Sequence, residues 1–317
     1  MTKEQLRGHA LELGFSSLGV CEALPAAHHD FYMQWLDRGY QGTMQYLAEH
    51  AGLKADPKQL LPGARSVIVV TLDYNQPVES RPSSPHIARY ALGRNYHKLI
   101  RAKLRKLQAR IGNDECRVCV DSAPLLEREY AMRAGLGWFG KNTCLIDSRR
   151  GSWFFLGALL TTAEFEPDEP AQGGCGSCTL CIDTCPTGAI VFEDGRWQVD
   201  SRRCISYLTI EHRGEVEPAL AEEMGDWTFG CDICQEVCPF NEVRSSQPLR
   251  GGLATEPDLL AHRSWPSLGK IAEIGHEEWD LLTRGSAVRR AGYAGLKRNA
   301  AINLANQVAR KAKNEPK

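Results

Sequence analysis

Eight of the twelve cysteines in this 317-residue chain fall into two short runs and one position between them. The runs are Cys175, Cys178, Cys181 and Cys185, then Cys231, Cys234 and Cys238, with Cys204 between them. The first run is spaced C-x2-C-x2-C-x3-C-P, and the second also ends in Cys-Pro. Three thiolates so close along a chain can bind one iron–sulfur cluster, whereas the cysteine before proline binds the other. The spacing therefore predicts two [4Fe–4S] clusters with interlocked ligands.

Interlocking assigns four cysteines to each cluster. Cluster one takes Cys175, Cys178, Cys181 and Cys238. Cluster two takes Cys185, Cys231, Cys234 and, because the second run is one cysteine short of the usual four, Cys204. A zinc site is the alternative for paired C-x2-C motifs, and a disulfide framework is a weaker one. The two Cys-Pro endings and the total of eight thiols favour clusters.

The other four cysteines, Cys21, Cys116, Cys119 and Cys144, lie in apolar stretches. Cys116 and Cys119 also form a C-x2-C, but alternation over residues 116–120 favours a buried strand over a redox pair. Cluster thiolates need a reducing compartment. No apolar run approaches a membrane span and the amino terminus lacks a secretory signal. We therefore expect a cytoplasmic protein with no membrane partner.

The formal net charge of −1 hides a strong polarity along the chain. Residues 166–249 hold 16 acidic and 5 basic residues, whereas residues 89–110 hold eight basic residues and no acidic one. Residues 284–314 likewise hold eight basic residues and no acidic neighbour. A single basic block is often a solvated helix face. Two such blocks favour a polyanionic partner with a phosphate backbone.

Hydrophobic periodicity predicts alternating helices and strands up to about residue 165. Helices are expected over residues 2–13, 25–38, 95–111 and 124–134, and strands over residues 15–20, 66–74, 116–121 and 153–162. These elements predict an α/β domain over residues 1–165, a cluster domain over 166–248 and a helical tail over 249–317. Residues 285–306 predict two short helices divided near Gly292, a pattern that resembles one HEAT-type repeat. One repeat must pack against the preceding domain, so we expect its basic side to face outward.

The clusters need an electron acceptor, and the chain shows no internal nucleotide site for one. It has no G-x-x-x-x-G-K-[ST] loop and no convincing dinucleotide fingerprint after a strand. This argues against a bound NAD or FAD and against nucleotide-driven chemistry. The acceptor is therefore expected to be another cofactor.

Five separated stretches resemble the epoxyqueuosine reductase family, whose cobalamin-dependent enzymes complete queuosine synthesis at the wobble position of certain tRNAs. They are RYALGRNYH at residues 89–97, VDSAPLLER at 120–128, GLGWFGKN at 135–142, YLTIE at 207–211 and CDICQ at 231–235. Together with the cysteine runs they extend over nearly the whole chain. The helical tail is shorter than in longer members of the family.

The resemblance implies a nitroreductase-like α/β cobalamin domain, a ferredoxin-like domain with two [4Fe–4S] clusters and a short HEAT-type repeat. Cobalamin is held base-off in this family, and this chain has no D-x-H-x-x-G motif. His97 is therefore expected to be a satisfied structural histidine. The implied reaction reduces epoxyqueuosine in tRNA to queuosine, with electrons passed from an external low-potential donor through the clusters to cobalamin.

Asp121 matches the proton donor of that family. Loss of the epoxide oxygen as water consumes protons, and Asp121 follows an apolar strand where partial burial would disfavour its charged form. The alternative is that Asp121 caps the following helix, a common role for aspartate. The resemblance favours the catalytic role.

The resemblance also suggests contacts to the corrin and to tRNA. The expected corrin contacts are Tyr90, Tyr96, Asp121, Trp138, Gly140, Lys141, Asn142, Ser206, Arg213 and Asp232. Glycine permits close approach to a flat macrocycle, although glycine and aromatic residues are as common in turns and cores. The expected tRNA face, on a protein expected to be monomeric, consists of Arg94, Lys98, Arg101, Lys297 and Arg298.

Two other classes of function stay open on the sequence. One is a cobalamin-dependent reductase for a small molecule, such as a reductive dehalogenase, and the other is a plain electron carrier. The two basic blocks favour the tRNA enzyme. A dehalogenase usually bears an export signal, and a carrier needs neither the α/β domain nor Asp121.

Overall fold

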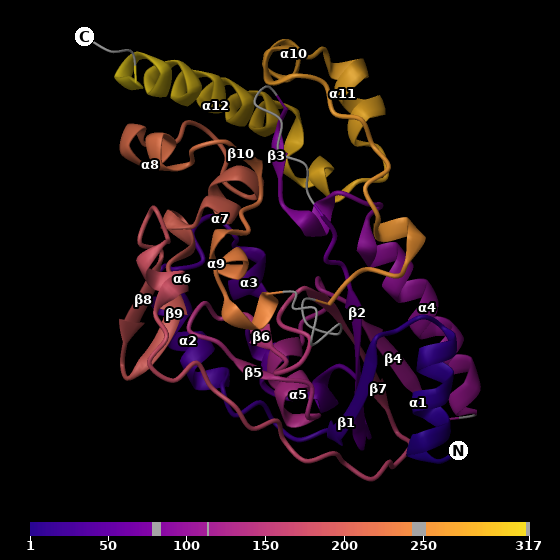
Figure 1. The fold of residues 1–317 in the computed structure, drawn as a ribbon. Coiled ribbons are helices and arrows are strands. Elements are labelled where there is room, and N and C mark those ends of the chain that lie inside the picture. Colours follow the sequence, from indigo (N-terminus) through magenta and orange to yellow (C-terminus); the bar gives the residue numbers. More distant parts are fainter. Residues whose placement is uncertain (78–83, 113, 243–251, 315–317) are drawn as a thin grey trace.

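A four-stranded antiparallel sheet forms the base of the amino-terminal half (Figure 1). The computed structural model describes residues 1–77, 84–112, 114–242 and 252–314. The strand order is β1 (Ser17–Glu22), β2 (Ser66–Asp73), β7 (Phe154–Thr161) and β4 (Cys116–Cys119). All four strands were predicted from hydrophobic periodicity and are confirmed, including the strand that carries Cys116 and Cys119.

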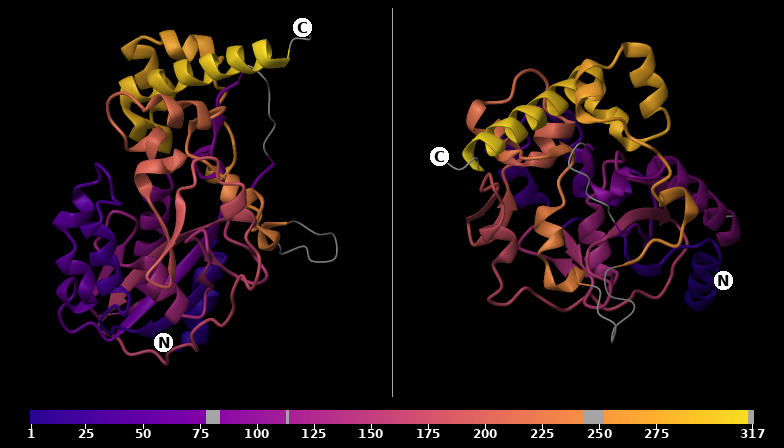
Figure 2. Two further views of the ribbon diagram at one scale, coloured as in Figure 1. Left: turned by 90° about the vertical axis from the view of Figure 1, so that its left-hand side faces the viewer. Right: turned by 45° about the horizontal axis from the view of Figure 1, so that its top comes forward.

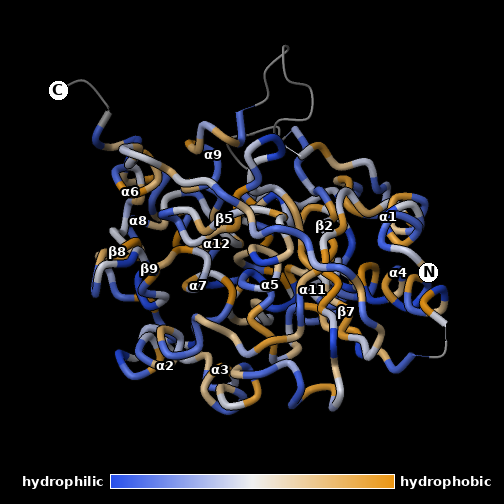
Figure 3. Tube along the Cα trace, turned by 90° about the horizontal axis from the view of Figure 1, so that it is seen from below, coloured by the Kyte–Doolittle hydropathy of each residue, from blue (hydrophilic) through white to orange (hydrophobic). Residues whose placement is uncertain are grey.

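Helices cover both faces of this sheet. Helices α1 (Lys3–Glu12) and α4 (Tyr96–Ile111) pack on the face that holds Ile68 and Val70, and α5 (Glu127–Arg133) packs on the face that holds Val67 and Val69. This alternation along β2 is the two-residue period of a strand buried on both sides. Figure 3 shows hydrophobic residues concentrated around β2 and β7. Helix α4 comes so close to β7 that a Cβ on Gly157 would lie 2.6 Å from Cγ2 of Ile100.

The remaining elements of this half are short. They are helices α2 (His29–Asp37) and α3 (Tyr46–Glu49), the 3-10 turns Gly52–Ala55, Pro57–Gln59 and Arg89–Ala91, and strands β3 (His86–Ile87), β5 (Trp138–Phe139) and β6 (Leu145–Ile146). The helix expected over residues 25–38 begins only at His29, after an irregular segment. The helix expected over residues 124–134 is confirmed as α5, which begins at Glu127.

The cysteine-bearing region packs above the sheet (Figure 2). Its elements are α6 (Leu180–Asp183), the hairpin of β8 (Ile190–Glu193) and β9 (Arg196–Val199), the 3-10 turns Ser201–Arg203 and Pro239–Asn241, α7 (Ile205–Ile210), α8 (Pro218–Glu223), β10 (Trp227–Phe229) and α9 (Ile233–Glu236). Strand β10 pairs in parallel with β3, which belongs to the first half of the chain. The domain limits stay predictions, and the boundary at residue 248 lies outside the described residues.

The carboxy-terminal tail is helical, as predicted. It contains the 3-10 turn Pro257–Leu259, α10 (Leu268–Glu273), α11 (His276–Thr283), the 3-10 turn Ala287–Ala291 and α12 (Gly292–Asn314). The expected division near Gly292 is confirmed, because the chain turns there at a φ of 74°. The segment after it is one helix of 23 residues instead of a short one. Within the described ranges, no helix is long and apolar enough to span a membrane.

Three asparagines attach α12 to the cysteine-bearing region. Asn299, Asn303 and Asn306 lie on one side of the helix and donate from Nδ2 to backbone carbonyls at 2.8–3.2 Å. The acceptors are the carbonyls of Thr209 and Thr228, of Gly225 and Trp227, and of Ala221, respectively. Because buried carbonyls need partners, these amides fix the position of α12.

The basic block of the tail has acidic neighbours in space, so the inference that nothing neutralises it is wrong. Its ion pairs are Arg284 and Arg289 with Asp280, Arg290 with Glu211, Arg310 with Asp226 and Lys313 with Glu222. Most of these acids come from the cysteine-bearing region, which is acidic in sequence. Five of the eight basic side chains of the block are therefore paired with acids, although they stay exposed at the surface.

Replacing Asn303 with Ala should destabilise the docked tail. The change leaves the buried hydroxyl of Thr228 and the carbonyl of Trp227 without their side-chain partner, which should lower the free energy of unfolding by about 1–3 kcal/mol. Urea titration would measure this loss. Lys311→Ala, at an exposed position of the same helix, is the control and should change stability by less than about 0.5 kcal/mol.

Candidate functional site

The two predicted sets of cluster ligands lie around two separate cavities. Cys175, Cys178, Cys181 and Cys238 line a small cavity, and Cys185, Cys204, Cys231 and Cys234 line a large one of about 800 Å³. Lys141, Asn142 and Cys175 line both, so the cavities adjoin. Each set draws on both cysteine runs, which is the interlocking that the spacing predicts.

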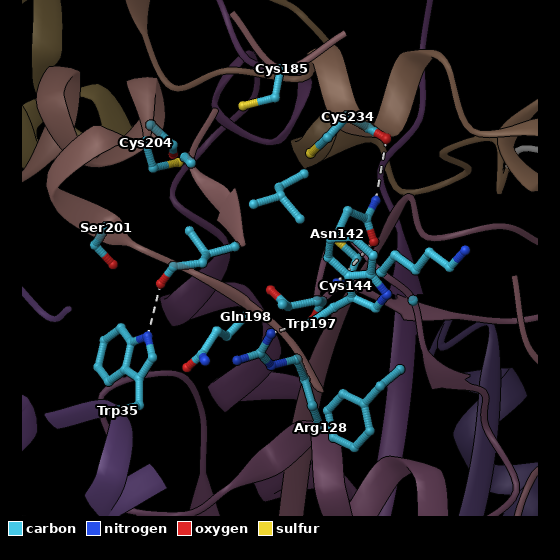
Figure 4. A pocket seen from close by; sticks show the side chains of 18 of the residues that line it. Trp35, Arg128, Asn142, Cys144, Cys185, Trp197, Gln198, Ser201, Cys204 and Cys234 are labelled. Carbon is cyan, nitrogen blue, oxygen red and sulfur yellow. Dashed lines mark hydrogen bonds between the residues drawn. The ribbon is translucent and has the colours of Figure 1, made fainter. Parts of the chain in front are cut away.

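Short helices and one turn bring the cysteines together. Helices α6 and α9 pack against each other, and each carries a cysteine of its run. The turn after β5 fastens both runs: Nζ of Lys141 donates to the carbonyls of Gly176 and Cys178, both at 2.9 Å, and Nδ2 of Asn142 donates to the carbonyl of Cys234 at 3.2 Å. Figure 4 shows the last of these bonds, with Cys185 and Cys204 elsewhere around the same pocket. The two runs are thus tied to the sheet domain.

The protein environment disfavours thiolates in both sets. Burial raises the pKa of Cys181 to about 11, and it also raises the pKa of Cys204, Cys231 and Cys238. Thiols of the same set add to the increase. Iron compensates this cost because a metal deprotonates the thiols that coordinate it. The donor sets therefore fit iron–sulfur clusters.

Three of the other four cysteines are isolated from the cavities, as expected. Burial raises the pKa of Cys21 and of Cys119 to about 12, and Cys116 is partly buried in β4. Cys144 differs from this expectation, because it lines the large cavity and its thiol hydrogen-bonds Cys234. Its apolar sequence context gave no signal of that contact.

The other walls of the large cavity combine aromatic rings with positive charges. Trp35, Phe139 and Trp197 supply rings, and Lys54, Arg128 and Arg196 supply cations. Trp35 is held by its Nε1, which donates to the carbonyl of Val199 in the β8–β9 hairpin at 2.8 Å (Figure 4). Apolar walls with a few polar groups are typical of cofactor sites, and the cations indicate an anionic group on the ligand.

Four of the expected corrin contacts line this cavity, namely Gly140, Lys141, Asn142 and Ser206. The other six are not among its described lining residues. Tyr90 and Tyr96 pack in an aromatic cluster with Phe155, and Trp138 packs edge-on against Phe240. Asp232 is buried and accepts from the backbone N–H of Arg89, and Arg213 donates to the carbonyls of Ile210 and Arg290.

Asp121 lies just outside the cavity, on the loop between β4 and α5. Its backbone adopts a φ of 52°, and its N–H donates to Oε1 of Glu127, which lines the cavity, at 2.8 Å. The expected partial burial is wrong, because the Asp121 side chain is 54% exposed. The alternative as a helix cap is wrong too, since Leu126 precedes α5. The Asp121 carboxylate instead hydrogen-bonds Nε2 of His97.

The residues expected to contact tRNA differ in whether their charges are already engaged by other groups of the protein. Lys98 and Arg101 lie on α4 and have no ion pair in the described part of the chain, whereas Arg94 pairs with Asp258 at 3.4 Å. Nζ of Lys297 lies 3.3 Å from the hydroxyl of Tyr293. The guanidinium of Arg298 donates to three backbone carbonyls, those of Leu208, His212 and Gly214. Arg298 therefore contributes to packing of the tail.

Two family models match this chain. Residues 174–241 match the model described as a 4Fe-4S double cluster binding domain, and residues 54–122 match the model described as epoxyqueuosine reductase QueG, DUF1730. The first match contains all eight cysteines of the two sets. The second contains α4 and ends just after Asp121.

Proteins and solved structures named epoxyqueuosine reductase are similar to this chain. The chain is 42% identical over 317 residues to the epoxyqueuosine reductase of Vibrio cholerae, over 95% of this chain and 82% of that protein. It is similar to a crystal structure of epoxyqueuosine reductase with an epoxyqueuosine-modified tRNA stem loop, with a TM-score of 0.84 and 27% identity over 96% of this chain and 81% of that one. A Bacillus subtilis epoxyqueuosine reductase, with its aspartate catalytic loop swung out of the active site, gives a TM-score of 0.83 and 28% identity over 98% and 82% of the chains.

Replacing Cys204 with Ala tests the assignment that departs from the usual spacing. Loss of this ligand should lower the iron content of the anaerobically reconstituted protein from about eight atoms per chain toward about four, since each cluster holds four. Iron analysis with electron paramagnetic resonance of the reduced protein would measure the loss. Cys116→Ala is the control, and equal iron in both variants would contradict the role of Cys204.

Proposed function

This chain belongs to the epoxyqueuosine reductase family, and we propose that it reduces the epoxide of epoxyqueuosine at the wobble position of tRNA to the alkene of queuosine. The large cavity carries this proposal. It adjoins the cysteines of cluster two on one side and Glu127 and Arg128, next to the Asp121 loop, on the other. Electrons and protons can thus reach one bound substrate from two sides.

The walls of the large cavity fit cobalamin, which we propose is bound base-off. Trp35, Phe139 and Trp197 would contact the flat faces of the corrin, and the cations Lys54, Arg128 and Arg196 would attract its phosphate. Asn142 and Ser206 would bind its amides. Gly140 has no room for a side chain, because a Cβ there would lie 2.5 Å from Cδ1 of Ile146. When bound, cobalamin would supply a strongly reducing centre for the proposed reaction.

The proposed electron path runs from an external low-potential donor through cluster one to cluster two. The cavity of cluster one is also lined by Leu180, which is 46% exposed, and by the exposed Pro239. The cavity of cluster two is the one that would hold the cofactor. Cluster one is therefore the better entry point for electrons, because it lies nearer the surface.

Asp121 is the proposed proton donor to the epoxide oxygen. Its left-handed backbone is held by the bond from its N–H to Glu127, and its side chain is exposed and free to face a ligand above the cavity. The named catalytic loop of the Bacillus subtilis relative also carries an aspartate. A bound nucleoside would cover Asp121 and supply the burial that the protein alone does not.

The proposed tRNA surface follows α4 away from Asp121. Lys98, Arg101 and Arg105 are spaced three and four residues apart, so they share one face of the helix. In the described part of the chain these three make no ion pair, whereas Lys103 and Arg110 of the same helix pair with Glu256 and Glu12. Unpaired cations in a row suit a phosphate backbone.

The decisive test of the function is the conversion of epoxyqueuosine-containing tRNA by the reconstituted full chain. Nucleosides would be identified by mass spectrometry after incubation with a strong reductant, with and without cobalamin. Queuosine that forms only with cobalamin supports the proposal. Unchanged tRNA with both clusters intact would point to a small-molecule reductase.

Asp121→Asn should slow the reaction and leave the cofactors bound. Asparagine keeps the shape of the side chain but cannot give up a carboxyl proton, so single-turnover formation of queuosine should fall by about 10²–10⁴-fold. Visible absorption would check that the clusters and cobalamin remain. Asp114→Asn, at an exposed position before β4, is the control, and a rate for Asp121→Asn equal to that of the control would reject the role.

The double variant Lys98→Gln, Arg101→Gln should weaken tRNA binding and lower the salt dependence of the affinity. Loss of two phosphate contacts should lower the slope of log Kd against log salt by about two. Fluorescence anisotropy at several salt concentrations would measure both effects. The matched control removes two paired cations of α12, in Arg310→Gln, Lys313→Gln; equal weakening in both double variants would contradict the proposed surface.

A further inference from the structure

Three hydrogen-bonded side chains, those of Asn95, His97 and Asp121, lie where α4 begins. Oδ1 of Asn95 accepts from the backbone N–H of His97 at 3.0 Å and lies 2.8 Å from Nδ1 of its ring. Nε2 of the same ring hydrogen-bonds Oδ2 of Asp121. Both nitrogens of the His97 ring have hydrogen-bond partners, as expected for a structural histidine. One of these partners, however, is the proposed proton donor.

The oxygen of Asn95 fixes which nitrogen of the His97 ring carries hydrogen. A backbone N–H only donates, so the Asn95 atom that faces it must be the amide oxygen. That oxygen only accepts, so Nδ1 of His97 must be protonated. In the neutral ring, Nε2 therefore accepts a hydrogen bond from the carboxyl of Asp121. In the imidazolium, Nε2–H donates a hydrogen bond to that carboxylate.

The proposed reaction needs two protons at the same atom. Conversion of an epoxide to an alkene breaks two C–O bonds, takes two electrons from the low-potential donor through the clusters, and releases the oxygen as water. Asp121 can transfer one proton, and it must then be protonated again while it still faces that oxygen. This requirement rests on the function proposed above.

We propose that His97 acts through Asp121 by returning the second proton from Nε2 to its carboxyl, and that Asn95 holds His97 in the state that permits this. The hydrogen bond along which the proton moves is already formed, so no side chain has to reorient. Tyr96 stacks on the ring at 4.1 Å and limits its rotation. His97 is thus a positioning and proton-returning residue, whereas Asp121 touches the substrate.

Other titratable groups surround this pair. Lys54, Tyr46 and Tyr90, from three further segments, lie near enough to Asp121 for its charge to act on them. Glu127 is the main competitor, because burial raises its pKa to about 8 and it therefore carries a proton near neutral pH. Glu127 contacts Asp121 through the backbone N–H, however, and not through the carboxyl. Only His97 is seen to bond the carboxylate within the described residues.

Single-turnover rates of the fully loaded, reduced full chain at pH 7 test the proposal. His97→Gln keeps a polar side chain that cannot carry a proton, and it should slow queuosine formation by about 100-fold. Asn95→Ser keeps a helix cap but cannot reach Nδ1, and it should slow the reaction by about tenfold. The exposed control His262→Gln should stay within about twofold. An unchanged rate in His97→Gln, or a loss of the same size in the control His262→Gln, would overturn the proposal.

Chemical rescue separates proton return from simple positioning. The ring of His97 is 28% exposed, so small azoles can enter the space left in His97→Ala. Recovery of the rate should follow the acid strength of imidazole and methylated imidazoles of similar size. Recovery that follows only their size, or no recovery, would show that His97 has a structural role alone.

Nitrogen-15 NMR of the His97 ring gives a readout that does not need activity. The neutral ring should be protonated at Nδ1 in the unmodified chain and should lose that preference in Asn95→Ser. A neutral ring protonated at Nε2 instead of Nδ1 would overturn the proposal even if the enzyme is active. If the unmodified chain forms no queuosine while Nδ1 is protonated, the proposed function fails and the hydrogen-bonded arrangement stands.

Discussion

The two cysteine runs lie side by side around adjoining cavities, and the rest of the structure is arranged about that constraint. Each set of four thiols draws on both runs. Residues 175–185 and 231–238 therefore cannot separate without pulling apart the walls of both cavities. The chain between the runs then has to fold back as the β8–β9 hairpin, α7 and β10. The hairpin becomes a wall of the large cavity, and β10 pairs with β3 of the other half. Lys141 and Asn142 complete the attachment by binding carbonyls of both runs.

The same folding back decides where charge is left over. The acidic region between the halves supplies Glu211, Glu222 and Asp226 to the basic tail, and their ion pairs neutralise much of that block. Surface ion pairs add little stability, so their main effect here is on the electrostatic potential around the protein. Within the described residues, Lys98, Arg101 and Arg105 of α4 make no ion pair, and neither do Lys54, Arg128 and Arg196 in the walls of the large cavity. A polyanion or an anionic cofactor would meet these cations there.

The proposed chemistry brings electrons and protons to opposite sides of one space. Cysteines of cluster two line the large cavity, and the Asp121 loop lies beside its far wall, held in a left-handed conformation by Glu127. A conformation of this kind in a residue other than glycine persists only where the surroundings hold it. Because the Asp121 side chain is exposed, a bound ligand would complete its environment. His97, already bonded to the carboxylate, links the reacting group to α4 and thus to the tRNA surface proposed there.

The sequence by itself determined the cysteine sets, the four strands of the sheet and the helices that cover it. Cysteine spacing and hydrophobic period are properties of neighbouring residues, so they can be recognised whatever the tertiary arrangement is. The sequence also determined membership of the family, through the five separated stretches and the cysteine runs. Only the tertiary structure decided that Trp35, Arg128 and Trp197 share one cavity. It also decided that Tyr90, Tyr96 and Trp138 pack against phenylalanine rings outside that cavity, and that Arg298 is used for packing. It alone placed His97 on Asp121, 24 residues away. These contacts depend on how distant segments meet, and neither local spacing nor period carries that information.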